Sequence, residues 1–186
     1  MRSRLVGGFT LIEVLVAVFV LAVGVMGAVA AQTVALRTRQ ESALMSHGVQ
    51  LATSFADRMR ANTPQMRLPD SGNPYLLLRY DAASDGPPGA PPVRCHAGAG
   101  CDSAAMASFD IHELRQELHA AFPSARVALC RDAVVWDEAA DRLSWECTGA
   151  SSDPVVLKLG WRSRPSSGDA SESAPMVAII VTGDPA

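Results

Sequence analysis

The sequence lacks the patterns on which most catalytic and nucleic-acid-binding functions depend. It contains no G-x-S-x-G run that would place a nucleophilic serine, and no glycine-rich phosphate loop. His112-Glu113 begins like the H-E-x-x-H zinc motif, but position 116 is glutamine. The formal net charge is −3, and arginine and lysine do not cluster after residue 60. We therefore expect a protein that is not an enzyme, holds no metal ion or cofactor, and does not bind nucleic acid.

Proline is also absent from the first 63 residues, and this leaves room for one long helix. Residues 9–31 are apolar except for a single carboxylate, Glu13. As a helix this segment spans roughly 35 Å, enough to cross a bilayer. Residues 32–62 are amphipathic, with apolar positions at helical spacing, and Pro64 disfavours helix at the residue before it. The pattern predicts a membrane-spanning first part and a second part that packs on a globular head.

An ordinary secretory signal is an alternative for the N-terminus. The first eight residues, MRSRLVGG, are basic, and Ala28-Val29-Ala30 offers an A-x-A cleavage pattern. The apolar core is longer than the usual 7–15 residues, however, and it contains a charge. If this alternative held, the product would be a secreted binding protein or enzyme released by signal peptidase.

The run Gly8-Phe9-Thr10-Leu11-Ile12-Glu13 resembles the G-F-T-L-x-E signature of type IV pilins and type II secretion pseudopilins. The resemblance implies that residues 1–8 are a leader. A membrane prepilin peptidase would cut between Gly8 and Phe9, and the same enzyme would methylate the new amine of Phe9. It also implies that Glu13 meets the terminal amine of a neighbouring subunit in a filament.

The position of Glu13 has a physical reason in that setting. A carboxylate within an apolar membrane helix costs about 2.5–3.5 kcal/mol on insertion scales. The first helical turn gives some relief through the helix dipole, and cleavage would create a positive amine nearby. An ion pair between subunits offsets the cost only when they are in register. The simpler alternative is that Glu13 snorkels to the membrane edge.

The four cysteines all follow the apolar segment, at positions 95, 101, 130 and 147. An even number in an exported region predicts two disulfides, and four cysteines allow three pairings. Sequence proximity favours Cys95–Cys101 and Cys130–Cys147. The C-H-x4-C spacing at Cys95 is not that of a usual zinc site.

The remainder divides into a loop-rich region, residues 63–107, and a head, residues 108–186. A proline and glycine tract at 85–92 has no core-forming residues, although residues 75–78 favour a short buried strand. A helix is predicted to start at Asp110, as its cap, and to end before Pro123. Four strands are expected at 126–131, 143–147, 155–161 and 176–182. In the third strand, Lys158 is expected on the solvent side.

These features together resemble the type IV pilin-like α+β fold, in which a long N-terminal helix packs on a four-stranded antiparallel sheet with one extra helix. Within that family the chain is similar to the PilV-type minor pilins, or pilus modification proteins. The residues carrying this likeness are Met59-Arg60-Ala61-Asn62, Cys95, Cys101, Phe109-Asp110, Leu114, Leu118, Pro123, Val127, Cys130-Arg131-Asp132, Val156 and Trp161-Arg162.

The likeness implies a minor pilin in the inner membrane, with its head in the periplasm, that joins a type IV pilus at low copy, near the tip. Its implied roles are pilus assembly, twitching motility and adhesion. The implied partners are the prepilin peptidase and methyltransferase, other minor pilins, the major pilin and the inner-membrane assembly platform. A minor pseudopilin of a type II secretion system shares the same N-terminus and is the alternative.

Overall fold

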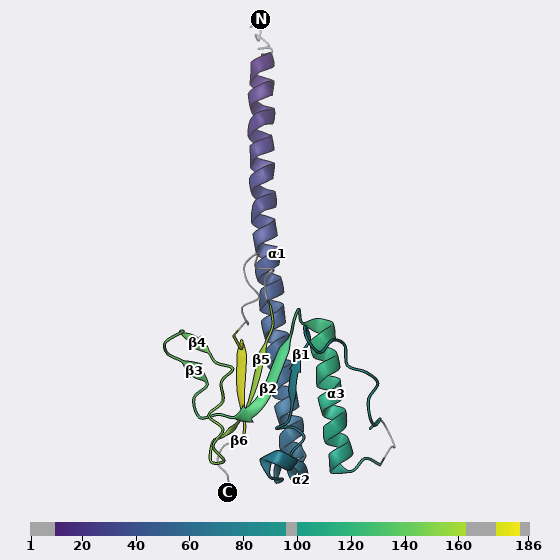
Figure 1. The fold of residues 1–186 in the computed structure, drawn as a ribbon. Helices are drawn as coiled ribbons and strands as arrows, with labels where there is room; N and C mark the ends of the chain where they lie inside the picture. The colour runs from purple at the N-terminus through teal and green to yellow at the C-terminus, as the bar shows by residue number, and fades with distance from the viewer. Residues whose placement is uncertain (1–9, 96–99, 163–173, 183–186) are drawn as a thin grey trace, which may run out of the picture. The chain divides into compact units, whose positions relative to one another are not determined.

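A computed structural model describes residues 10–95, 100–162 and 174–182 (Figure 1). It contains three α-helices, one short 3₁₀ helix and six strands within those ranges: α1 (Leu11–Ala61), α2 (Thr63–Met66), η1 (Asp70–Gly72), β1 (Arg79–Asp81), α3 (Ser103–Ala121), β2 (Arg126–Arg131), β3 (Trp136–Asp137), β4 (Arg142–Leu143), β5 (Val155–Gly160) and β6 (Val177–Thr182). The chain forms two compact units, Met1–Ala43 and Leu44–Ala186. Because the boundary falls within α1, one helix contributes to both units.

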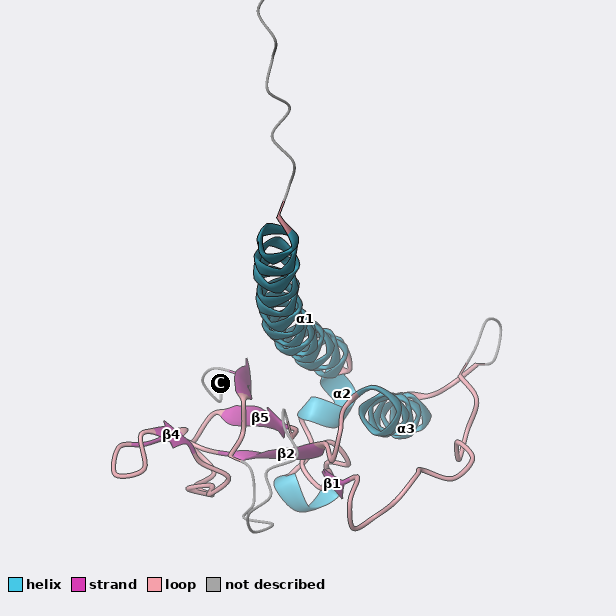
Figure 2. Ribbon diagram, turned by 90° about the horizontal axis from the view of Figure 1, so that it is seen from above, coloured by secondary structure: helices cyan, strands magenta, loops and turns pink. Residues whose placement is uncertain are grey.

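The head is built on a four-stranded antiparallel sheet with the order β1-β2-β5-β6. Val127 lies opposite Leu159, and Leu129 lies opposite Leu157, so these four side chains share one face of the sheet. The last part of α1 and α3 cover that face, as the view from above shows (Figure 2). The long helix packed on a small antiparallel sheet with an additional helix matches the type IV pilin-like α+β fold.

Helical spacing determines which residues α1 gives to the core. Its buried positions are Gly48, Ala52, Phe55, Ala56 and Met59, which recur every three or four residues along one face. Glycine at position 48 is required by a close approach, because a Cβ atom there would lie 2.6 Å from Cη2 of Trp161. Gly48 is therefore a packing site, where a broad aromatic ring lies directly on the helix backbone.

The end of α1 is also tied to the edge strand β6. The Arg60 guanidinium donates hydrogen bonds to the carbonyl oxygens of Val181 and Ile180, each over 2.8 Å. A third bond, of 2.6 Å, joins Arg60 to Asp57 one turn earlier on α1. These contacts fix the outer strand of the sheet to the helix that underlies it.

The composition of the sheet differs from the prediction in one strand. The expected strand at 143–147 does not join the main sheet; its first residue belongs to β4, which pairs only with β3. The fourth strand is instead β1, which has only three residues, too few to show an alternating pattern. The predicted strand at 75–78 is also wrong, since this segment is a turn, although Tyr75 and Leu78 are buried.

The helix α3 begins earlier than predicted. It starts at Ser103, and the Asp102 side chain caps it by accepting a 2.8 Å hydrogen bond from the Ala105 amide. Asp110, expected to be the cap, lies mid-helix and is 5% exposed. The alanine-rich start of the helix favours helix formation without an apolar stripe, so periodicity alone could not reveal it.

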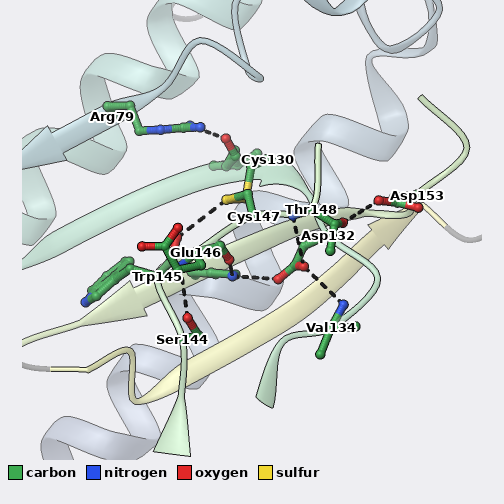
Figure 3. The surroundings of a disulfide bond; sticks show 12 residues. Arg79, Cys130, Asp132, Val134, Ser144, Trp145, Glu146, Cys147, Thr148 and Asp153 are labelled. Atoms are coloured by element: carbon green, nitrogen blue, oxygen red, sulfur yellow. Dashed lines mark hydrogen bonds and ion pairs between the residues drawn. A yellow bond between two sulfur atoms is a disulfide. The ribbon is translucent and has the colours of Figure 1, made fainter. Parts of the chain in front are cut away.

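The largest departure concerns β5. All six of its residues are buried, including Lys158, whose expected position on the solvent side was wrong. The segment between β2 and β5 folds over this second face of the sheet, and the Cys130–Cys147 disulfide ties the segment down (Figure 3). The Arg126 guanidinium lies 4.3 Å from the centre of the Trp145 ring, within the same layer.

Candidate membrane and assembly segment

The first part of α1 buries no side chain within the chain. Every residue from Thr10 to Gln40 is exposed, and large apolar side chains lie on all sides of the helix. An 18-residue window of α1 has a mean hydropathy of 2.8, and none of it is buried. A helix satisfies its own backbone hydrogen bonds, so this segment meets the length and composition required of a membrane span.

Two hydroxyl groups on this segment are bonded to the helix itself. Thr33 donates to the carbonyl oxygen of Ala30 over 2.7 Å, and Thr38 donates to that of Val34 over 3.2 Å. Such bonds satisfy the hydroxyl donors without a water molecule or another chain. These two hydroxyl groups therefore do not prevent the helix around them from lying in an apolar environment.

Glu13 differs from these threonines. It lies in the first turn of α1, where its amide donates to the carbonyl oxygen of Thr10 over 3.1 Å. Its carboxylate makes no hydrogen bond or ion pair with any residue that the structure describes. The helix dipole favours a negative charge at this end, but a full counter-charge has to come from elsewhere.

The proposed cleavage and methylation positions, Gly8 and Phe9, lie outside the described residues. Of the predicted N-terminal site residues, the structure therefore places only Glu13. It shows that this carboxylate lies at the start of a continuous helix and is exposed. The cleavage at Gly8, the methylation of Phe9 and the assembly role of Glu13 remain predictions.

The cysteines form two disulfides in the pairing that sequence proximity favours. Cys95 is bonded to Cys101, with Cα atoms 5.8 Å apart, and Cys130 is bonded to Cys147, with Cα atoms 6.2 Å apart. Among the residues described, no group of three or more histidine, cysteine or acidic side chains could hold a metal ion.

A buried ion pair under the second disulfide was not predicted from the sequence. Lys158 Nζ lies 2.6 Å from Asp132 Oδ2, and both side chains are 1% exposed. Lys158 also donates to the carbonyl oxygen of Glu146. The other oxygen of Asp132 accepts from the Val134 amide over 3.0 Å (Figure 3). This network fixes the segment between β2 and β5, the covering segment, to β5. Its only signal in the sequence was an isolated lysine within an otherwise apolar strand.

A second network missed from the sequence joins α1 to α3. The Tyr75 hydroxyl donates to Asp110 Oδ2 over 2.9 Å and accepts from the Asn62 side chain over 3.0 Å. Arg58 pairs with Asp110 over 3.4 Å and with Glu113 over 2.6 Å. Burial raises the pKa of the Tyr75 phenol well above its ordinary value, so it stays protonated and serves as a donor.

In the comparison with known proteins, only the N-terminus of the chain finds a match. Residues 3–29 match the prokaryotic N-terminal methylation motif. No curated protein and no solved structure matches the chain. The motif supports a pilin or pseudopilin family, and it implies processing by a prepilin peptidase and assembly with other pilins. Together with the apolar helix it suggests a membrane-anchored, structural protein.

Proposed function

We propose that the chain is a minor pilin of a type IV pilus, incorporated at low copy near the tip, where it promotes pilus assembly, twitching motility and adhesion. Before assembly it is a single-pass protein of the inner membrane with its head in the periplasm. Its partners are the prepilin peptidase and methyltransferase, other minor pilins, the major pilin and the inner-membrane assembly platform.

The observation that carries this proposal is a methylation motif at the start of a fully exposed apolar helix. The motif covers residues 3–29, and the exposed stretch runs from Thr10 to Gln40. A helix with no partner in its own chain needs apolar surroundings, which a membrane and then the packed helices of a filament both supply. The carboxylate of Glu13 needs a cation there, and a processed neighbour carries one on its terminal amine.

Each part of the chain has a role in this proposal. Residues 1–8 are the leader, and residues 9–31 are first the membrane span and then part of the filament core. Residues 32–62 are the amphipathic part of the stalk. Residues 63–107, which contribute β1 and the start of α3, and residues 108–186 together form the head, which the filament presents to the outside.

The first experiment maps the N-terminus of the protein purified from producing cells by mass spectrometry. We expect a chain that begins with N-methylated Phe9. A chain that retains residues 1–8 in assembled filaments would contradict the proposal. A chain that begins after Ala30 would assign the protein to the secreted class, released by signal peptidase.

The second experiment tests the charge. Glu13→Ala should be processed normally yet enter sheared filaments several-fold less than the unmodified chain, because its apolar helix no longer has a carboxylate to pair with a neighbour's amine. Gln32→Ala, on the same exposed helix, is the matched control and should enter normally. Normal filament levels of the Glu13 variant would exclude a role for this charge.

A minor pseudopilin is the second candidate, since the same motif supports it. Deletion of the gene separates the two. Loss of surface pili and of twitching, with normal secretion of folded exoproteins, supports the pilin. Loss of secretion with normal pili supports the pseudopilin.

A further inference from the structure

Two arginines at the end of the apolar stretch of α1 have no partner in the part of the chain that the structure describes. α1 carries arginines at positions 37, 39, 58 and 60. Arg58 pairs with carboxylates of α3, and Arg60 bonds to carbonyl groups of β6. Arg37 and Arg39 are exposed and make no hydrogen bond or ion pair with any described residue. Both guanidinium groups are therefore free to bind a group outside the chain.

The distance between these arginines and Glu13 matches the thickness of a membrane. All three residues belong to the same compact unit, Met1–Ala43, and no residue from 14 to 36 carries a charge. Because a helix rises 1.5 Å per residue, the Cα atoms of Glu13 and Arg37 lie about 36 Å apart along α1. The hydrocarbon core of a bilayer is about 30 Å thick, and helices cross it with a modest tilt. When α1 spans a membrane, Glu13 and Arg37 therefore lie just outside the hydrocarbon, near opposite surfaces.

The layer next to the hydrocarbon contains the phosphate groups of the lipids. It is roughly 5–8 Å thick on each side, within reach of an arginine side chain at its edge. A guanidinium group forms two parallel hydrogen bonds with a phosphate, which makes arginine well suited to this layer. Because successive residues are 100° apart around a helix, Arg37 and Arg39 point in directions about 200° apart. Each of them therefore meets a different lipid, on opposite sides of α1.

The charges favour an anionic lipid over a zwitterionic one. In phosphatidylcholine an ammonium group accompanies each phosphate, whereas in phosphatidylglycerol the phosphate charge is not balanced. The whole chain carries a net charge of −3, so its overall charge does not attract it to an anionic surface. The next carboxylate along the helix, Glu41, is partly buried and is engaged in a contact of its own. A preference for an anionic lipid therefore has to come from Arg37 and Arg39.

We propose that Arg37 and Arg39 bind the phosphate groups of anionic phospholipids where α1 leaves the membrane. Each guanidinium donates to the phosphate oxygens of one lipid, and the two lipids lie on opposite sides of the helix. With this end of the span at one surface, Glu13 lies near the other, where water solvates its carboxylate until the chain assembles. The proposal rests on the membrane stage of the proposed function, and it adds a lipid as the partner at that stage.

The test uses the full-length chain in phosphatidylcholine vesicles that contain a trace of spin-labelled lipid. Electron paramagnetic resonance separates lipid that is immobilised on the protein from lipid that moves freely. We expect spin-labelled phosphatidylglycerol to be immobilised several-fold more than spin-labelled phosphatidylcholine. Arg37→Gln combined with Arg39→Gln should lower this ratio at least about threefold, because two guanidinium groups at the surface are lost.

A matched control removes the same charge from the head. Arg94→Gln combined with Arg142→Gln changes two exposed arginines of the head and should leave the lipid ratio unchanged. Arg2 and Arg4 precede the span and are present in every variant, so they do not affect the comparison. In the unmodified chain, about 0.5 M sodium chloride should lower the ratio, which tests the charge dependence without any substitution.

The outcomes separate this site from the membrane span itself. Equal immobilisation of the two lipids by the unmodified chain, or an unchanged ratio in the variant that lacks Arg37 and Arg39, would overturn the lipid site and leave the span standing. If neither lipid were immobilised, the span would be wrong as well. Loss of that variant from sheared filaments, with its lipid ratio unchanged, would assign the two arginines to carboxylates of another subunit instead.

Discussion

Glu13 and Lys158 are both charged residues among apolar neighbours, and the chain treats them in opposite ways. Lys158 is fully buried and has Asp132 2.6 Å away, with a backbone carbonyl as a further acceptor. Glu13 is exposed, and no described residue pairs with its carboxylate. The head supplies the counter-charge for its own buried cation, whereas the N-terminal segment leaves its charge for something outside the chain.

The head and the N-terminal segment therefore differ in whether they are stable without a partner. A domain that pairs its buried charges needs no outside group to neutralise them, and it avoids the several kcal/mol that an unpaired buried ion costs. A segment that exposes apolar side chains on all sides and one unpaired acid is stable only where its surroundings supply apolar contacts and a counter-charge. Changes in the head should therefore appear in its stability, and changes in the N-terminal segment in its assembly.

The largest effect is expected from Asp132→Ala. It leaves Lys158 buried without a counter-charge, and the free energy of unfolding should fall by about 3–5 kcal/mol, as measured by chemical denaturation of the head transition. Lys158→Met with Asp132→Leu removes both charges and should recover most of that loss. If Asp132→Ala alone had no effect, the pair would not be buried as described.

The second effect concerns the disulfide that holds the covering segment over Lys158. Replacing Cys130 and Cys147 with alanine opens a loop of 17 residues and should cost about 3 kcal/mol in the chain-entropy estimate. Replacing Cys95 and Cys101 opens a loop of only 6 residues and should cost about 2 kcal/mol. Thermal unfolding of the two double variants tests the order, and a reversed order would contradict the role given to the covering segment.

A third, smaller effect should follow Gly48→Ala. The new methyl group would collide with the Trp161 ring, and the free energy of unfolding should fall by about 1–3 kcal/mol. Gly27→Ala is the matched control, because a Cβ atom at that position meets nothing within 4 Å. Equal melting temperatures for the two variants would show that Trp161 moves aside without loss.

A weaker contribution to the free energy of unfolding comes from the half-exposed ion pair of Asp70 and Arg131. In exposure this pair lies between buried Lys158 and exposed Glu13. Hydrogen bonding from Arg131, over 2.7 and 2.9 Å, holds the pKa of Asp70 below its ordinary value. The pair therefore stabilises the fold above the ordinary carboxyl pKa, and this contribution is lost as the pH falls through the lowered one. Because Asp70 is 45% exposed, the loss should be below about 1 kcal/mol, seen as a steeper acid decline than in Asp70→Asn.

The smallest effect on stability is expected from Glu13→Gln. No described residue contacts this carboxylate, so the melting temperature of the head should stay within error of the unmodified chain when both are measured in detergent. A clear shift in either direction would show that the head senses this position, and the contrast drawn above would be wrong.

Local patterns in the sequence predicted the parts of the fold that depend on local physics. The end of α1 near Pro64 and the long strands β2, β5 and β6 follow from backbone restriction and apolar runs. The position of Glu13 in a first helical turn also follows from its place in the apolar run. The short strand β1 could not be predicted, because three residues carry no measurable period.

What the sequence did not predict depends on contacts between distant residues. Lys158 looks like the polar position of an alternating strand. Only the segment between β2 and β5, which the Cys130–Cys147 disulfide holds against the sheet, turns that position into a buried one. Asp110 looks like a helix cap, yet its partners, Tyr75 and Arg58, lie 35 and 52 residues earlier. Tertiary structure determines such pairings, and the spacing of residues along the chain does not predict them.

The hydrogen bonds from Arg60 to β6 affect how the chain behaves at high concentration. An outer strand with unoccupied carbonyl groups is a template on which another chain adds a strand, and such addition leads to aggregation. Arg60 occupies the carbonyl oxygens of Ile180 and Val181, beside an isoleucine that is 56% exposed. These two hydrogen bonds therefore leave fewer free acceptors on β6 for a strand from another chain.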